Sequence, residues 1–289
     1  MSAKYALLLL FFSIPGTASA LIPQAPQGFG IGFDVSMNRI RNYSTNLLHQ
    51  SNWLQAKRLY EQHIITKAEY SEDPRIPEII HWIWLGSPFP ENLKAFQETW
   101  KVHHPTWKFM LWTEKEIEEL GLTNKKLYDT ATNYGEKSDI ARYEILYRIG
   151  GLYVDTDFEC LRPFDIFHHC CDFYTGLNCG PSFMIFNGII ASRPGHPILE
   201  NCIAALNSPT TLKNRDPHFI EQRTGPIFFT GIIQRYMHTC TDKTVIFPTS
   251  YFYPWPFFER KHNTRAQIEK WIMPETFAIH HWHTSWMKK

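Results

Sequence analysis

The chain has 289 residues, of which 44% are hydrophobic, and this is enough to build one large globular domain with a substantial core. Its 29 basic and 28 acidic residues leave a formal net charge of +1. Such a balance argues against a nucleic-acid-binding protein, because phosphate backbones are bound by surfaces with a basic excess. Aromatic residues make up 15% of the sequence, and their rings can serve either the core or the stacking walls of a sugar or base site.

The N-terminal residues have the pattern of a secretory signal peptide. Lys4 precedes a short apolar run, and Ala18 and Ala20 frame a cleavage site of small residues, so we predict a signal peptide over residues 1–20. The run is too short to cross a bilayer as a helix, although retention as an uncleaved anchor stays open. We therefore expect export, either to the lumen of the endoplasmic reticulum or Golgi in a eukaryote or out of the cell in a bacterium. Export also permits disulfides among the six cysteines, whose spacing defines no pairing and indicates no zinc site.

Residues 21–75 are predicted to form a helical lead-in segment before the main domain. The segment begins with a stretch rich in Pro and Gly, and its apolar residues then recur at helical spacing over residues 36–70. Two roles are compatible with this pattern, namely packing on the main domain and peripheral contact with a membrane surface. The sequence leaves both alternatives open.

Strands and helices alternate from residue 79 to residue 154, whereas residues 180–289 are less regular and rich in Pro and aromatic residues; we assign all of residues 76–289 to one main domain. An order of strand, helix, strand, helix, strand is typical of an α/β fold in which helices cover both faces of a parallel sheet. Ser138 is expected to cap the beginning of the third helix, and Gly150 and Gly151 to end it. The predicted strands are 79–85, 107–112 and 152–154, and the predicted helices are 91–101, 114–120, 139–149 and 198–207.

Two acidic residues, Asp155 and Asp157, follow directly after the third predicted strand. Residues two apart in an extended segment point to the same side, so both carboxylates can face one ligand at the carboxyl end of the sheet. Adjacent carboxylates repel each other unless a cation lies near them, and oxygen ligands suit Mn²⁺ or Mg²⁺. The motif therefore predicts a divalent-metal site that can hold a diphosphate, although a solvated turn is the alternative for an isolated Asp-x-Asp.

Asp139 and Arg142 lie at the start of the predicted helix 139–149. Their spacing of three residues places them on one face, near a helix N-terminus that attracts anions through its backbone N–H groups. Arg142 adds a guanidinium fork suited to phosphate. The alternative interpretation is a surface ion pair that contributes about 0.3 kcal/mol to stability.

Taken together, residues 138–157, with the sequence SDIARYEILYRIGGLYVDTD, resemble the family of sugar transferases named for a DXD-containing sugar-binding region. The family includes Golgi mannosyltransferases of the yeast type and is akin to the glucosylating domain of large clostridial toxins. Residues 76–84, 105–112 and 280–286 resemble its first strand, its second strand and its terminal aromatic-histidine motif. The resemblance implies an α/β fold of the GT-A type, a Rossmann-like mixed sheet with helices on both faces, and sugar transfer with retention of anomeric configuration.

The resemblance also implies roles for individual residues. Asp139 would hydrogen-bond hydroxyl groups of the donor sugar, and Arg142 would contact the sugar or the diphosphate. Tyr153 would lie near the diphosphate. Asp155 would contact the donor sugar and ribose or the metal, and Asp157 would be the main protein ligand of the metal.

Further predicted contacts of the nucleotide-sugar donor and the metal lie elsewhere in the chain, and each has a structural alternative. Trp84 resembles the ring that stacks on the donor base, but it would also suit the core of a buried strand. Asn187 falls where such enzymes place an amide near the donor or acceptor, whereas Asn187-Gly188 also fits a hairpin turn, the interpretation we prefer. At the C-terminus we favour His281 as a second metal ligand and Trp286 as a ring that closes over the donor, with a packed terminal tail as the alternative.

We therefore predict a metal-dependent retaining glycosyltransferase that moves a hexose from a UDP- or GDP-sugar donor to a glycan, glycolipid or protein acceptor. A catalytically inactive carbohydrate-binding module on the same fold is the first alternative. A sugar hydrolase with Asp155 and Asp157 as acid and base is less consistent with the pattern, since glycosidase carboxylates flank the scissile bond from opposite sides.

Overall fold

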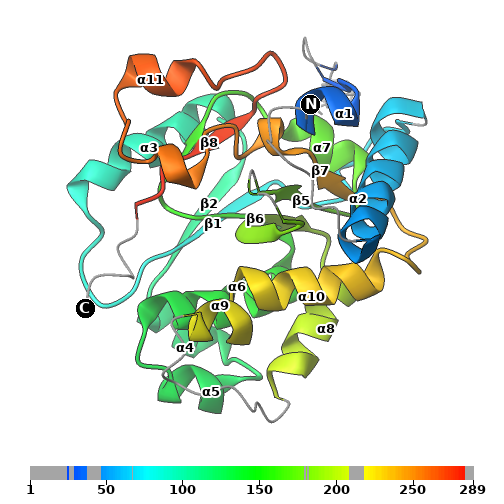
Figure 1. Cartoon of the computed structure of the whole chain (residues 1–289). Coiled ribbons are helices and arrows are strands. Elements are labelled where there is room, and N and C mark those ends of the chain that lie inside the picture. The colour runs from blue at the N-terminus through cyan, green and yellow to red at the C-terminus, as the bar shows by residue number, and fades with distance from the viewer. Residues whose placement is uncertain are drawn as a thin grey trace, which may run out of the picture.

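The computed structural model describes residues 25, 29–37, 47–66, 68–178, 180, 182–207 and 218–283. The predicted signal peptide and Trp286 lie outside these residues. A six-stranded sheet with strand order β2-β1-β3-β6-β5-β7 runs through the middle of the molecule between layers of helices (Figure 1). Its strands are β1 (Ile79–Ile83), β2 (Lys108–Trp112), β3 (Gly151–Val154), β5 (Phe173–Leu177), β6 (Ile185–Ser192) and β7 (Thr244–Phe247).

The large sheet is mixed, and a second sheet has two strands. In the large sheet, β1 pairs in parallel with β2 and β3, β5 pairs in parallel with β7, and β6 runs antiparallel between β3 and β5. Every residue of β3, β5 and β7 is buried, as expected for strands with helices on both faces. The small sheet pairs β4 (Phe158–Cys160) with β8 (Ala278–His280) in antiparallel fashion.

Helices cover both faces of the sheet, with α6, α8, α9 and α10 in one layer and α2, α3 and α7 in the other (Figure 1). α6 and α10 pack on β6, whereas α2 packs on β7. The predicted α/β fold with a mixed sheet and helices on both faces is therefore confirmed. Within the described residues, no helix is both long enough and apolar enough to cross a membrane. The helices are α1 (Phe33–Met37), α2 (Leu47–Tyr60), α3 (Glu91–His103), α4 (Glu114–Leu120), α5 (Lys125–Thr130), α6 (Tyr134–Ile149), α7 (Asp165–Cys170), α8 (Pro197–Leu206), α9 (Phe219–Arg223), α10 (Pro226–Tyr236) and α11 (Arg265–Glu269).

The described part of the lead-in segment packs on the main sheet. α2 continues into a π-helical turn over Glu61–Thr66, and the side chains of Phe33, Trp53 and Tyr60 are buried in the common core. The Tyr60 hydroxyl lies 2.8 Å from the Tyr251 hydroxyl of the main domain. One face of α2 is therefore occupied by the sheet, and its opposite face remains exposed to solvent.

Two glycines direct the chain from α6 into β3. Gly150 and Gly151 have φ values of 71° and 100°, which side chains with a Cβ rarely adopt. A Cβ on Gly150 would also lie 2.7 Å from the Pro194 ring and 2.9 Å from the Pro77 ring. The predicted end of the helix at Ile149 is confirmed, and this tight turn determines where β3 begins.

The predicted beginning of α6 is wrong by about one turn. The helix begins at Tyr134, and the side chain of Asn133 caps it by accepting the backbone N–H of Gly135 at 2.7 Å. Ser138 lies inside the helix, where its hydroxyl accepts a hydrogen bond of 3.0 Å from Arg142. Asp139 and Arg142 therefore lie inside the helix and not in its first turn, whose N–H groups we expected beside them.

The predicted hairpin turn at Asn187 and Gly188 is also wrong. Both residues lie within β6, which pairs with β3 on one side and with β5 on the other. The backbone carbonyl of Gly188 accepts the N–H of Asp155 at 2.8 Å, at the carboxyl end of β3. Long-range strand pairing therefore outweighs the local turn preference of the Asn-Gly dipeptide.

The described cysteines form no disulfide bond. The Sγ atoms of the neighbours Cys170 and Cys171 are 3.6 Å apart, which is a contact rather than a covalent bond. Burial raises the pKa of the Cys202 thiol, so this side chain behaves as a small apolar group. The free thiols among the described residues are Cys160, Cys170, Cys171, Cys202 and Cys240.

Candidate active site

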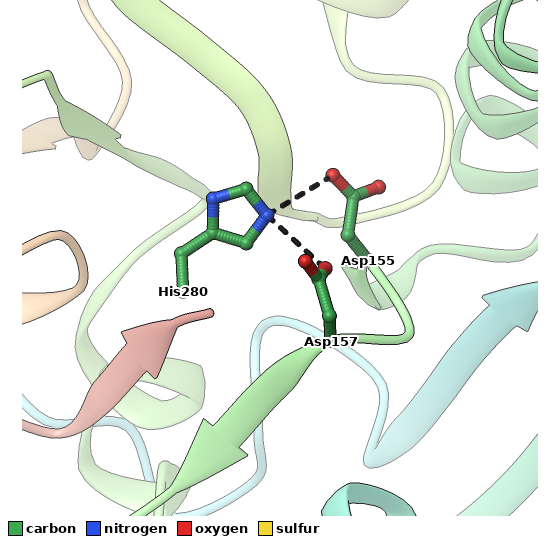
Figure 2. Close-up of side chains that lie close together, drawn as sticks. All are labelled: Asp155, Asp157 and His280. Carbon is green, nitrogen blue, oxygen red and sulfur yellow. Dashed lines mark hydrogen bonds and ion pairs between the residues drawn. The ribbon is translucent and has the colours of Figure 1, made fainter. Parts of the chain in front are cut away.

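Three side chains of metal-ligand type meet where β3, β4 and β8 come together. Asp155 follows β3, Asp157 precedes β4, and His280 is the last residue of β8. One ligand atom from each residue lies within 4.8 Å of the others. Figure 2 shows that a single imidazole nitrogen, Nε2 of His280, faces both carboxylates, at 3.1 Å from Asp157 Oδ1 and 3.8 Å from Asp155 Oδ2.

The small sheet brings this histidine to the aspartates. The β4–β8 register sets Phe158 opposite His280, and the His280 ring stacks on the Phe158 ring with centroids 4.7 Å apart. The segment after β8 then binds Asp157 through its backbone. The N–H of His281 donates to the Asp157 carbonyl at 3.0 Å, and the N–H of His283 donates to its carboxylate Oδ2 at 2.6 Å.

The structure brings His280 to the aspartates, not His281, which we expected as the second metal ligand. His281 points elsewhere, and its Nε2 lies 2.9 Å from Glu159 Oε2. Consecutive side chains of an extended segment point to opposite sides. An error of one residue in the expected register therefore exchanges the surroundings of His280 with those of His281. The imidazole that faces the two carboxylates is therefore that of His280.

The electrostatic environments of the two aspartates differ. Burial raises the pKa of Asp155, although the Arg142 guanidinium partly opposes this effect. Burial acts in the same direction on Asp157, but His280 and the N–H of His283 outweigh it and hold the pKa of Asp157 below its usual value. Asp157 is therefore the carboxylate that stays ionised most readily.

Arg142 lies at the centre of a buried polar network rather than on the surface. Its Nη2 is 3.2 Å from Asp139 Oδ1, and its Nη1 is 3.3 Å from Asp155 Oδ1. Nη1 also donates to the Asn187 carbonyl at 2.6 Å, and the guanidinium carbon lies 4.3 Å from the centroid of the Tyr153 ring. With only 6% and 9% of the Arg142 and Asp139 side chains exposed, the alternative of a solvated surface ion pair is excluded.

The network also fixes the orientation of Asp139. Its Oδ1 accepts a hydrogen bond of 2.7 Å from the Asn187 amide, and its Oδ2 accepts one of 2.9 Å from the Thr224 hydroxyl. Burial raises the pKa of Asp139 to about 6, against the opposing effect of Arg142. The Tyr153 hydroxyl donates to Asp155 Oδ1 at 2.7 Å. The carboxylates of Asp139 and Asp155 therefore each accept a hydrogen bond from a neighbouring side chain. Nothing in the sequence pattern indicated Thr224.

Asp139, Arg142, Tyr153, Asp155 and Asn187 line a cavity of about 760 Å³, within the range of sites for small molecules and cofactors. Trp84 lies on its wall and is not part of the buried core, and its indole N–H donates to the Ser87 hydroxyl at 3.1 Å. Of the predicted site residues, the cavity brings together Trp84, Asp139, Arg142, Tyr153, Asp155, Asp157 and Asn187, but not His281.

The cavity wall includes two rings and a glycine that sequence reasoning missed. Trp282 has a φ of 56° and packs on the Tyr253 ring, with centroids 5.9 Å apart. A Cβ on Gly188 would lie 2.6 Å from Asp155 Oδ2 and 3.3 Å from the Tyr253 hydroxyl, so only glycine fits there without displacing the aspartate. Trp282 was within the recognised terminal motif, whereas Tyr253 had no signal in the sequence.

Comparison with known proteins agrees with this geometry. Residues 90–172 match the family described as glycosyltransferase sugar-binding region containing DXD motif. Inositol phosphoceramide mannosyltransferase 3 of Schizosaccharomyces pombe is 30% identical over 199 residues, which cover 66% of this chain and 51% of that protein. Mannosyl phosphorylinositol ceramide synthase SUR1 of Saccharomyces cerevisiae is 31% identical over 178 residues, which cover 56% of this chain and 42% of that protein. The chain thus spans about half the length of these yeast proteins.

Among solved structures, the PaToxG glycosyltransferase is similar with a TM-score of 0.48 and 17% sequence identity, over 71% of this chain and 78% of that chain. The matched family region contains four residues that meet in the cavity, namely Asp139, Arg142, Asp155 and Asp157. The sequence match and the buried DXD site at the carboxyl end of β3 lead to the same assignment. Over residues 90–172, this chain is similar to the glycosyltransferase family whose sugar-binding region contains a DXD motif.

Proposed function

We propose that this protein is a metal-dependent, retaining glycosyltransferase that moves a hexose from a UDP- or GDP-sugar to a glycan, glycolipid or protein acceptor. The observation that carries the proposal is the meeting of Asp155, Asp157 and His280 at one side of a cavity that Asp139 and Arg142 also line. A diphosphate and a sugar need this combination of negative ligand atoms for a cation and directional donors and acceptors for hydroxyl groups.

The residues present fit a divalent cation. Two carboxylates and one imidazole supply oxygen and nitrogen ligands, and the His280 Nδ1 is buried without a hydrogen-bond partner in the described part of the chain. This donor set suits a borderline ion such as Mn²⁺ better than Ca²⁺, and Mg²⁺ is the second candidate. When bound by Asp155, Asp157 and His280, the ion would supply positive charge to the departing diphosphate.

The chain's own residues would bind and orient the donor. Asp139 presents a carboxylate held by Asn187, so it can accept hydrogen bonds from sugar hydroxyls in a defined direction. Arg142 lies between that carboxylate and Asp155 and can donate to the sugar or to a phosphate oxygen. Trp84 offers a partly exposed ring on the cavity wall against which a nucleobase can stack.

We place the protein in the lumen of the secretory pathway and keep a glycan or a lipid as the first acceptor classes. Support comes from the names of its yeast relatives, which describe mannose transfer to inositol phosphoceramide and synthesis of mannosyl phosphorylinositol ceramide. A sugar hydrolase is disfavoured, since Asp155 and Asp157 both face the same nitrogen of His280 and thus lie on one side of a ligand.

The test is release of nucleotide from UDP-glucose, UDP-galactose, UDP-N-acetylglucosamine and GDP-mannose by the full chain, with Mn²⁺ or with chelator. We expect Mn²⁺-dependent release from one donor and a loss of about 100-fold or more in Asp157→Asn. Glu159→Gln is the matched control, because Glu159 lies two residues further on, binds His281 and Arg265, and does not line the cavity.

Two outcomes would count against the proposal. Release that persists in chelator and in Asp157→Asn would remove the metal role. Calorimetric binding of a sugar by the folded protein, with no turnover of any donor in the presence of simple sugars and lipids as acceptors, would favour the inactive binding module.

A further inference from the structure

Exposed aromatic rings lie at the mouth of the cavity. A 3₁₀ turn over Phe257–Glu259 follows Pro256, and Phe257 lines the cavity while it is 36% exposed. The next residue, Phe258, is 68% exposed. Tyr134 also lines the cavity, and 53% of its surface is exposed. Single exposed apolar residues are common, but a cluster around one opening indicates an apolar partner.

Positive charge accompanies these rings. The Arg260 guanidinium lies over the Phe257 ring at 3.9 Å from its centroid, and Lys261 is exposed. Within the described residues, no carboxylate lies at ion-pair distance from either cation. The nearest acidic neighbour in sequence, Glu259, is held by His262 at 2.7 Å. Aromatic rings beside cations that have no ion-pair partner among the described residues are the chemistry that recognises the interface of an anionic bilayer.

The exposed face of α2, for which the sequence also left membrane contact open, is less suited to this partner. Leu54 is 67% exposed there beside two cations, Arg58 and Lys57, and Lys57 contacts the carboxylates of Asp34 and Glu61. A cation already paired with two acidic groups gains little from anionic lipid. The charge pattern therefore favours the loop at the cavity mouth over α2.

We infer that the loop over residues 256–263 docks the protein on an anionic lipid bilayer. The Phe258 ring enters the boundary between headgroups and acyl chains, and Arg260 and Lys261 face the lipid phosphates. Because Phe257 of the same loop lines the cavity, docking turns the cavity mouth toward the bilayer surface. Docking on a bilayer is a property separate from the proposed transfer reaction, and it does not require the protein to turn over a donor.

The experiment is cosedimentation of the full chain with vesicles of phosphatidylcholine alone or mixed with phosphatidylserine, without donor and without metal. We expect binding to the anionic vesicles that weakens with salt. Phe258→Ser should lower the partition coefficient about tenfold, since it removes a ring that the bilayer would bury. Lys261→Glu should lower it by a similar factor on anionic vesicles only.

Two controls match these changes on other surfaces. Leu54→Ser removes an equally exposed apolar group from α2, and Lys115→Glu makes the same charge change on α4, where the lysine side chain is 76% exposed. Both should bind vesicles like the wild type. Asp157→Ala should bind as well, which separates this inference from the proposed activity, and near-normal far-ultraviolet circular dichroism would show that each variant is folded.

Several results would overturn the inference. They are absence of vesicle binding by the wild type, binding that Phe258→Ser and Lys261→Glu leave unchanged, and binding that is lost in Leu54→Ser instead. Self-association of the wild type that Phe258→Ser abolishes, with no vesicle binding, would show that the loop pairs two copies of the chain and would likewise refute bilayer docking.

Discussion

Arg142→Leu offers the sharpest test of the buried network. The guanidinium lies 3.2 Å from Asp139 and 3.3 Å from Asp155, and it donates to the Asn187 carbonyl at 2.6 Å. Its removal leaves two carboxylates and one carbonyl oxygen without their cationic partner in a site where Asp139 and Arg142 are less than a tenth exposed. Removing one partner of a buried ion pair typically costs 3–5 kcal/mol, so we expect the free energy of unfolding to fall by about 3 kcal/mol or more.

The measurement is urea unfolding followed by tryptophan fluorescence at pH 7.5 in the presence of chelator. Lys125→Leu is the control, because Lys125 also contacts two carboxylates, those of Glu118 at 2.8 Å and Asp129 at 3.0 Å, but does so on the surface. Exposed pairs contribute little, and we expect the control to change stability far less than Arg142→Leu does. Equal losses in the two variants would refute the reasoning.

The pH dependence gives a second readout of the same variant. Burial already raises the pKa of Asp139 to about 6, above its value in the unfolded chain. A carboxyl group whose pKa is higher in the folded state than in the unfolded chain makes the free energy of unfolding fall as pH rises from about 4 through the folded-state pKa. The reason is that the folded state holds the proton up to a higher pH than the unfolded chain does. Without Arg142 the pKa of Asp139 should rise further. Arg142→Leu should therefore regain part of its loss at pH 5, and the double variant with Asp139→Asn should regain part of it at pH 7.5.

Three further predictions concern other parts of the molecule. His280→Ala should weaken Mn²⁺ binding at least about tenfold in calorimetry, whereas His281→Ala should leave it nearly unchanged, and the reverse order would restore the sequence-based assignment. Gly188→Ala should lower donor turnover about 100-fold with little change in folding, because the added Cβ would lie 2.6 Å from the Asp155 carboxylate and displace it. Unchanged turnover would mean that catalysis does not need the carboxylate at this position. Asp242→Asn should destabilise the fold by roughly 2 kcal/mol at pH 7, because hydrogen bonds from His196, Thr244 and Tyr236 hold the pKa of Asp242 well below its usual range despite burial. Its deficit in urea unfolding should shrink as pH falls below about 4, where the wild-type carboxyl loses this advantage, and a deficit independent of pH would contradict the assignment.

The sequence predicted the fold well where local and tertiary forces agree. Apolar runs that end at glycine or at charged residues correctly indicated β1, β2 and β3, and α4 begins and ends as predicted at Glu114 and Leu120. Thr113 and Glu116 form a capping box there, and Gly121 ends the helix with a φ of 67°. The antiparallel insertion of β6 between β3 and β5 had no local signal, since strand order depends on pairing partners far apart in the chain.

What the sequence by itself determined is the chemistry of the site. Two carboxylates two residues apart after a buried strand, with Asp139 and Arg142 on the preceding helix, specify which groups can meet at the carboxyl end of the sheet. Only the tertiary structure decided how they meet. It made the Asp139–Arg142 pair buried rather than solvated, and it selected His280 over His281 through the β4–β8 register. The register depends on contacts between residues more than a hundred positions apart, and the burial of Asp139 depends on contacts with Asn187 and Thr224, which are 48 and 85 positions away. Contacts over such separations leave no trace in local residue patterns.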